Sequence, residues 1–316
     1  MTKLLIARPA PDEVHAALGG FDVTYRDVHT PLTADEMKAA LRDYDGVLPT
    51  LGDVFSADVF AQVKNPRCKI LANFGVGYNH IDTTAARASG VEVSNTPGAV
   101  TDATADIGMT LMLMAARRAG EGERLVRSGA WTGWHPSQLL GMHLTGKTVG
   151  IVGMGRIGQA VAQRCHYGFS MPVKYFSRSA KDLPYKAEHI NDLKALVAAV
   201  DVVVIAVPGG DETHHLINAD VLAAMQPHGL LINIARGNVV QESALIDALQ
   251  SGSIGGAGLD VYEFEPKVPE ALRVLDNVVL LPHLGTSSHE VRVDMWRMAV
   301  ENLKAGVAGK TPPNAV

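Results

Sequence analysis

Three polar side chains in the C-terminal half offer the most specific chemistry in this sequence. Arg236, Glu265 and His283 each follow an apolar, strand-like run, and ligands of open α/β sheets bind outside the carboxyl ends of strands. Arginine holds a carboxylate in bidentate fashion and polarises an adjacent carbonyl. Histidine exchanges protons near neutral pH, and a neighbouring glutamate fixes its tautomer. Beside a nicotinamide, the three residues predict hydride transfer to a 2-keto acid, with His283 protonating the oxygen.

A glycine-rich segment supplies the expected place for that nicotinamide cofactor. Residues 153–158 read Gly-Met-Gly-Arg-Ile-Gly, which matches G-x-G-x-x-G. A β-branched run precedes this segment and a helix-like run follows it, so the glycines stand on a strand-to-helix turn. There the backbone approaches a pyrophosphate held at the helix N-terminus. The expected cofactor contacts are Gly153, Gly155, Arg156, Ile157 and Gly158.

The end of the next strand favours NADP(H) over NAD(H). Folds specific for NAD usually place Asp or Glu there, about 20 residues past the loop, to bind the ribose 2′-hydroxyl. Here the strand runs into Ser177, Arg178 and Ser179. An arginine between two hydroxyls attracts a 2′-phosphate, whereas a carboxylate would repel it. NAD(H) stays open as the second cofactor.

The elements that must position these residues follow from alternating short apolar runs and longer amphipathic ones, typical of βα units and parallel sheets. The first hundred residues predict five strands: Lys3 to Ala7, Phe21 to Tyr25, Gly46 to Pro49, Lys69 to Asn73 and Val91 to Ser94. A long helix is expected from Thr101 to about Arg127. Six further strands are expected over Thr148 to Val152, Val173 to Phe176, Val202 to Val207, Leu230 to Ile234, Gly256 to Leu259 and Val278 to Leu281, the count of a doubly wound dinucleotide fold. One more helix is expected from Ser288 to Ala305.

This order of elements predicts an α/β protein with a discontinuous first domain. Residues 1–98 and 288–316 would form a smaller, flavodoxin-like substrate domain. Residues 99–287 would form a doubly wound (Rossmann) dinucleotide-binding domain inserted into it, with the active site expected in the cleft between the two.

The sequence resembles the D-isomer-specific 2-hydroxyacid dehydrogenases over essentially its whole length. The resemblance rests on the glycine loop and on ordered motifs at residues 75–82, 95–97, 101–106, 235–237, 258–261, 265–266 and 282–283. Within the family, the chain looks most like NADPH-dependent glyoxylate/hydroxypyruvate reductases. The resemblance implies that Arg236, Glu265 and His283 are catalytic and that backbone N–H groups of Val76 and Gly77 bind the substrate carboxylate. It also implies a cofactor site lined by Thr104, Val207, Pro208, Thr213, Ile234, Asp260 and Gly285.

The substrate is expected to be small and without a phosphate group. Residues 49–55, with Leu51 and Gly52, stand where the family's substrate loop lies, and this segment has no Lys or Arg to pair with a phosphate. 3-Phosphoglycerate is therefore disfavoured, although it and D-lactate remain alternatives. A second class also stays open, because some relatives act as nucleotide-sensing co-repressors and keep the same residues.

Composition excludes several other classes. The formal net charge is −5, without a basic block, so neither nucleic acid nor an anionic membrane is an expected partner. The lack of an apolar run of about 18 residues argues against a membrane-spanning helix, and the two cysteines, too few for a disulfide framework, favour a reducing cytoplasm. No metal site is expected, because the adjacent pair His214 and His215 has no further ligand at a recognisable spacing.

Two apolar groups have expected structural roles. The cluster formed by Met109, Leu111, Met112, Leu113 and Met114 is expected at a homodimer interface, as the resemblance implies. Trp131 and Trp134 are expected to be buried structural aromatics, with an interface or a substrate pocket as alternatives.

Overall fold

The computed structural model describes residues 1–316 and divides into two compact units. Unit 1 consists of Met1–Val100 and Ser287–Val316, and unit 2 of Thr101–Thr286. The predicted boundaries were residues 98 and 288. None of the helices is both long and apolar enough to cross a membrane.

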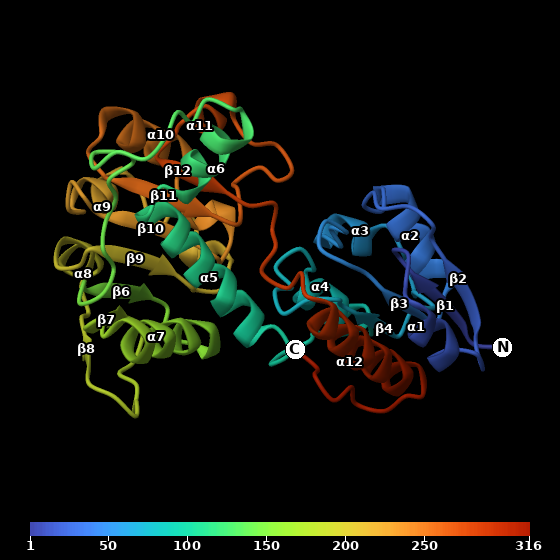
Figure 1. The fold of residues 1–316 in the computed structure, drawn as a ribbon. Coiled ribbons are helices and arrows are strands. Elements are labelled where there is room, and N and C mark those ends of the chain that lie inside the picture. Colours follow the sequence, from blue (N-terminus) through green and yellow to red (C-terminus); the bar gives the residue numbers. More distant parts are fainter. The chain divides into compact units, whose positions relative to one another are not determined.

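Unit 1 contains a five-stranded parallel sheet in the order β2-β1-β3-β4-β5, which is the flavodoxin-like order (Figure 1). Its strands are β1 (Lys3–Ile6), β2 (Asp22–Tyr25), β3 (Gly46–Leu48), β4 (Ile70–Ala72) and β5 (Glu92–Ser94). Its helices are α1 (Asp12–Ala17), α2 (Ala34–Asp43), α3 (Ala57–Ala61), α4 (Thr83–Ala88) and α12 (His289–Val307). The five strands are those expected from the sequence.

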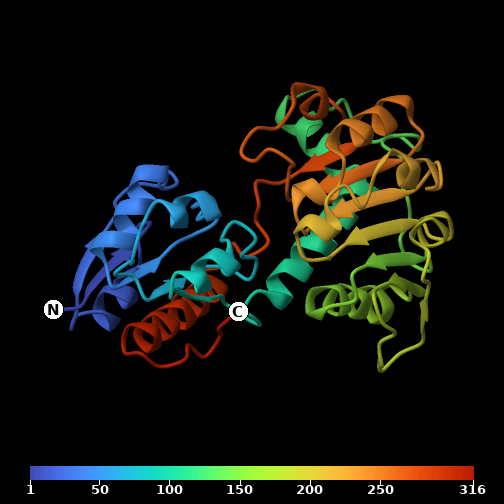
Figure 2. The ribbon, with the colours of Figure 1, turned by 180° about the vertical axis from the view of Figure 1, so that it is seen from behind.

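Helix α12 joins unit 1 although about 190 residues separate it from the rest of that unit. It packs against β3 and β4, and both views of the ribbon show this red helix beside the blue-to-teal sheet (Figures 1 and 2). Buried Asn302 fixes the helix, since its side chain donates to Asn95 O at 3.0 Å and accepts from Asn314 N at 3.0 Å. The sheet of unit 1 is therefore formed by the N-terminal part of the chain and covered on one face by a C-terminal helix.

Unit 2 contains a seven-stranded parallel sheet in the order β12-β11-β10-β9-β6-β7-β8. Its strands are β6 (Val149–Val152), β7 (Val173–Phe176), β8 (Ala187–His189), β9 (Val202–Ile205), β10 (Leu230–Asn233), β11 (Gly256–Leu259) and β12 (Val278–Leu280). Its helices are α5 (Thr101–Ala116), α6 (Ala119–Arg127), α7 (Arg156–Phe169), α8 (Leu193–Ala198), α9 (Ala219–Ala223), α10 (Glu242–Ser251) and α11 (Glu270–Arg273), with 3₁₀ turns η1 (Asp211–Thr213) and η2 (Gly237–Val239). The order reverses between β6 and β9, as in doubly wound folds.

Unit 2 differs from the prediction in one helix and one strand. The single helix expected from Thr101 to Arg127 is broken into α5 and α6, because Arg118 has φ 52°, a left-handed conformation that a continuous helix cannot contain. The sheet has a seventh strand, β8, which was not predicted because its three residues, Ala-Glu-His, lack an apolar run.

The roles expected for two apolar groups were also wrong. Met109, Leu111 and Met112 are buried in the core of unit 2 and therefore do not form an interface; of the expected group, Met114 is half-buried and Leu113 is 37% exposed. Trp131 and Trp134 are not buried, with 50% and 79% of their surfaces exposed. The helix face that looked like an interface packs on the sheet instead.

Candidate functional site

A histidine–glutamate pair lies just past the carboxyl ends of β11 and β12. His283 Nδ1 is 2.9 Å from Glu265 Oε2, and about a third of each side chain is exposed. The other carboxylate oxygen, Oε1, accepts from Tyr262 N at 3.0 Å, which fixes the glutamate. His283 N donates to Asp260 O at 2.9 Å. Both partners are thus held by the backbone of the β11 loop.

The ionisation of Glu265 determines the tautomer of His283. Burial raises the pKa of Glu265, but the hydrogen bond and charge of His283, the Tyr262 N–H and the charge of Arg236 together lower it below its ordinary value of 4.5. At neutral pH the carboxylate is ionised and can only accept hydrogen bonds. Nδ1 of His283 therefore carries a proton and donates, which leaves Nε2 as the nitrogen that can exchange a proton with a ligand.

Arg236 follows β10, the strand next to β11 in the sheet. Its guanidinium is desolvated, which lowers its pKa, while the charge of Glu265 opposes this shift. Nη1 donates to Ala235 O at 2.7 Å, and the Asn233 side chain donates to Arg236 O at 3.0 Å while accepting from Ala235 N. The structure thus brings the three predicted catalytic residues to the same edge of one sheet.

Asp260 lies at the end of β11 and is 2% exposed. It accepts from Leu284 N at 2.6 Å and Gly285 N at 2.8 Å, and Thr104 Oγ1 donates to Gly285 O at 3.1 Å. Desolvation raises its pKa, although these N–H groups and the charge of His283 oppose the shift. The residue is therefore a buried acceptor that shapes the loop containing His283.

The predicted dinucleotide loop joins β6 to α7 as expected. Gly153 has φ 100°, and a Cβ there would clash with the backbone at Val207, while a Cβ at Gly158 would overlap the carbonyl of Gly153. Gly155 is the N-cap of α7, makes no side-chain cap, and has open space where a Cβ would stand. This open space lies at the N-terminus of a 14-residue helix, whose first N–H groups have no partner within the helix, an arrangement that favours a phosphate.

The Ser177–Arg178–Ser179 segment follows β7 directly. Ser177 Oγ donates to Ser179 O at 2.6 Å, and Lys181 Nζ donates to Ser179 Oγ at 3.1 Å, so a second cation stands beside Arg178. Arg178 is 94% exposed and lies 3.9 Å from the equally exposed Glu212 carboxylate. The segment is cationic and hydroxyl-rich, but it also has an acidic neighbour that the sequence did not reveal.

The other predicted cofactor residues of unit 2 also lie past strand ends. Val207 and Pro208 follow β9, and Ile234 follows β10. Thr213 Oγ1 donates to Pro208 O at 2.8 Å and to Gly210 O at 3.1 Å, which folds the segment after β9 back on itself.

The predicted substrate-binding residues belong to two loops of unit 1. In the first, Asn73 Nδ2 donates to Gly75 O and Gly77 O, both at 3.1 Å, and Asn95 Nδ2 donates to Val76 O at 2.9 Å. All three carbonyl groups are thereby paired within unit 1, and these bonds fix the loop that contains Val76 and Gly77.

The second loop contains exposed Leu51 and Gly52, whose φ is 98°. Fully buried Asp53 accepts from Thr50 N at 2.8 Å, Leu32 N at 2.7 Å and Arg8 Nη2 at 2.9 Å. The one arginine that contacts this loop is therefore paired with Asp53.

Sequence reasoning missed the polar residues that hold these loops. Asn73, Asp53 and Asn233 are buried without being candidates for chemistry. A usable signal existed for Asn73 and Asn233, because an amide side chain at the end of an apolar strand is typical of a residue that bonds the following turn.

Comparison with known proteins identifies the chain's relatives. The family model described as "D-isomer specific 2-hydroxyacid dehydrogenase, NAD binding domain" matches residues 109–285. Glyoxylate reductase of Pyrococcus furiosus is 41% identical over 322 aligned residues, which cover 99% of this chain and 95% of the relative. Glyoxylate/hydroxypyruvate reductase B of Serratia proteamaculans is 42% identical over 299 residues, which cover 94% and 91% of the two chains.

A solved structure supports the same relationship. The NADPH-dependent glyoxylate/hydroxypyruvate reductase of Sinorhizobium meliloti, in complex with NADP and malonate, superimposes with a TM-score of 0.89 at 36% identity and covers 100% of this chain and 96% of its own. The shared fold therefore extends over both units.

Proposed function

Because the chain belongs to the D-isomer specific 2-hydroxyacid dehydrogenase family and is of the glyoxylate/hydroxypyruvate reductase type, we propose that it reduces these two 2-keto acids with NADPH. The products are the corresponding 2-hydroxy acids, of D configuration where the carbon is chiral. One observation carries the proposal: the 2.9 Å pair of His283 Nδ1 and Glu265 Oε2 stands at the sheet edge that also holds Arg236. That edge presents a proton donor and a carboxylate-binding cation together.

The proton transfer follows from the hydrogen bonds of the pair. Glu265 accepts from Nδ1 and stabilises positive charge on the imidazole, so Nε2 of His283 donates a proton to the substrate carbonyl oxygen. Arg236 binds the substrate carboxylate and polarises the carbonyl, and its guanidinium stays charged at any working pH. When bound, the reduced nicotinamide supplies the hydride. The N–H groups of Val76 and Gly77 are further donors for the substrate carboxylate.

The preference for NADPH rests on the segment after β7. Arg178 and Lys181 provide two cations and Ser177 and Ser179 two hydroxyls, a set that suits a 2′-phosphate. The glycine loop, Thr104, Val207, Pro208, Thr213, Ile234, Asp260 and Gly285 would hold the rest of the cofactor.

A small substrate without phosphate fits the loop at Leu51 and Gly52. That loop has no basic side chain of its own, and Arg8 is paired with Asp53 at 2.9 Å. Phosphoglycerate is therefore a poorer candidate than glyoxylate.

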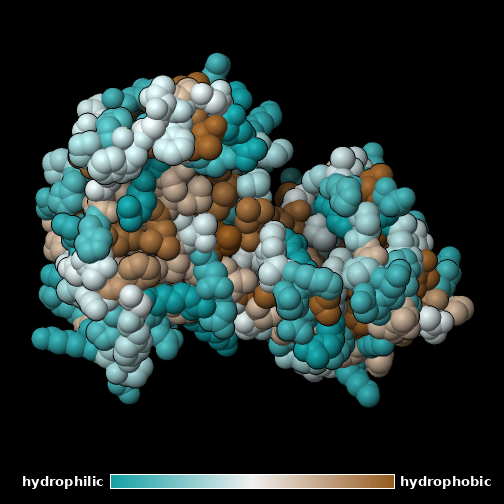
Figure 3. Space-filling model, in the orientation of Figure 1, coloured by the Kyte–Doolittle hydropathy of each residue, from teal (hydrophilic) through white to brown (hydrophobic).

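A homodimer is the assembly that we propose. Apolar residues gather on the face of unit 2 over the C-terminal end of α5 (Figure 3). Between residues 113 and 140 five large apolar side chains are exposed, namely Leu113, Val126, Trp131, Trp134 and Leu140, and we propose that they contribute to the contact with a second copy. This set replaces the buried methionines as the predicted interface.

A substrate panel with both cofactors tests the activity. We expect oxidation of NADPH with glyoxylate and hydroxypyruvate, weaker turnover with pyruvate, and a lower kcat/KM with NADH. His283→Gln should lower kcat by about a hundredfold or more while NADPH still binds, whereas the control His135→Gln should leave kcat unchanged. Turnover of no 2-keto acid would overturn the proposal in favour of a nucleotide-sensing role.

A further inference from the structure

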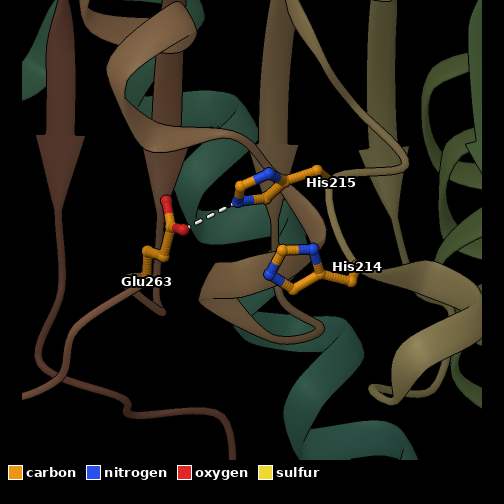
Figure 4. Close-up of side chains that lie close together, drawn as sticks. All are labelled: His214, His215 and Glu263. Atoms are coloured by element: carbon orange, nitrogen blue, oxygen red, sulfur yellow. Dashed lines mark hydrogen bonds and ion pairs between the residues drawn. The ribbon is translucent and has the colours of Figure 1, made fainter.

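A cluster of two histidines and a glutamate lies in unit 2 and is not used in the proposed reaction. His214 and His215 follow η1, and Glu263 belongs to the loop after β11 (Figure 4). One ligand atom of each residue lies within 4.8 Å of the other two. His215 Nε2 and Glu263 Oε1 are 2.7 Å apart, although 48 residues separate them in the sequence.

The backbone turns both imidazoles to the same side. Adjacent side chains of an extended segment point to opposite faces, but His215 has φ 50°, which breaks the alternation. Its N–H donates to Asn238 O at 2.8 Å and so fixes this turn. The two rings are stacked with centroids 3.9 Å apart and an interplanar angle of 28°. A left-handed conformation costs free energy in a residue with a side chain, and here it presents two ring edges beside one carboxylate (Figure 4).

Glu263 is positioned by reciprocal hydrogen bonds with a second glutamate, Glu242. Glu242 N donates to Glu263 Oε2 at 3.0 Å, and Glu263 N donates to Glu242 Oε2 at 3.3 Å. This reciprocal pair leaves Oε1 as the oxygen directed at the histidines.

We propose that His214, His215 and Glu263 bind a divalent transition-metal ion of the Zn²⁺ class. Two imidazole nitrogens and one carboxylate oxygen match the three-ligand sets of open zinc sites, while Mg²⁺ and Ca²⁺ prefer oxygen alone. The sequence predicted no metal here, because the third ligand is distant along the chain. A bound ion would join the segment after β9 to the loop that also contains Glu265.

Zinc titration by calorimetry on the untagged full chain tests the site without substrate or nucleotide, so its outcome is independent of the proposed activity. The matched control is His135→Ala, which removes another exposed histidine of unit 2, one whose Nδ1 lies 3.2 Å from Ser137 Oγ. Because loss of even an outer partner weakens metal sites by roughly 10–100-fold, His214→Ala should weaken Zn²⁺ binding at least about tenfold, and the control should not.

Two further measurements make the result decisive. Co²⁺ should give the visible absorption of a nitrogen- and oxygen-ligated ion with the wild type and lose it with His214→Ala. Glu263→Gln, which keeps a hydrogen-bond acceptor for His215, should also weaken Zn²⁺ binding. The proposal is overturned if the wild type binds no Zn²⁺, or if His214→Ala binds it with unchanged stoichiometry and affinity.

Discussion

The backbone of Tyr262 occupies the space that a side chain at position 237 would need. A Cβ built on Gly237 would overlap the carbonyl group of Tyr262 and the N of Glu263. The loop after β10, which follows Arg236, and the loop after β11, which precedes Glu265, are therefore packed backbone against backbone.

Gly237→Ala should consequently destabilise unit 2. One of the two loops must move, and overpacking of this kind costs about 1–3 kcal/mol or more of unfolding free energy. The matched control is Gly168→Ala in α7, where a Cβ meets nothing within 4 Å and the helix should gain up to about 1 kcal/mol. Urea denaturation of both variants measures the difference, and equal stability of Gly237→Ala and wild type would contradict the close approach.

Arg236→Lys should lower kcat/KM by about a hundredfold. Lysine keeps the positive charge but loses the planar fork that binds a carboxylate in bidentate fashion, and misplacement of a substrate by an ångström costs about this much. Arg297→Lys, in an exposed ion pair with Asp294, serves as the control and should be neutral. Steady-state kinetics with glyoxylate measure kcat/KM for both variants, and an unchanged kcat/KM in Arg236→Lys would contradict bidentate binding of the substrate carboxylate.

Glu265→Gln should change the pH dependence of both activity and stability. The pKa of Glu265 is lower in the folded protein than its ordinary value of 4.5, so ionised Glu265 contributes stability above about pH 4.5 that is lost as the pH falls through the lower folded pKa. The amide lacks this contribution, and the stability difference between variant and wild type should shrink in acid.

The same amide no longer stabilises a charged imidazole. The rate of reduction by Glu265→Gln should therefore fall and its optimum should move to lower pH. Initial rates measured across pH test this, and an unshifted profile would show that the carboxylate charge does not act on His283.

Cofactor choice should respond in opposite directions to two neighbouring substitutions. Arg178→Ala removes a cation and should raise KM for NADPH about tenfold or more with little effect on NADH. Glu212→Gln removes the carboxylate 3.9 Å from Arg178 and should lower KM for NADPH, more at low ionic strength than at high. Equal effects on both cofactors would exclude recognition of the 2′-phosphate by this segment.

The parts of the fold that were predictable have strong local patterns. The strands β6 and β9 contain only apolar residues, β10 is apolar up to its last residue, and all three are fully buried; their order along the chain was sufficient to predict a doubly wound sheet. Strand β8 and the break at Arg118 were not predictable, because neither has a local signal: β8 is polar, and the left-handed Arg118 stands where the chain departs from the packed helix α5.

The candidate site likewise contains residues that were predictable from the sequence and residues that were not. Arg236, Glu265 and His283 were predictable because each follows an apolar strand. The partners Glu212 and Glu263 were not, since contacts between residues distant in the sequence depend on how the loops fold after their strands end. Only the structure shows that Glu263 reaches the adjacent histidines.

The position of α12 has a consequence for how the protein forms during synthesis. Unit 2 is one continuous segment, so it can fold as soon as it has left the ribosome. Unit 1 cannot, because its sheet at β3 and β4 waits for a helix that is translated after the whole of unit 2. Until then the emerging chain carries an uncovered apolar sheet face, and exposed surface of this kind makes a folding intermediate prone to aggregation.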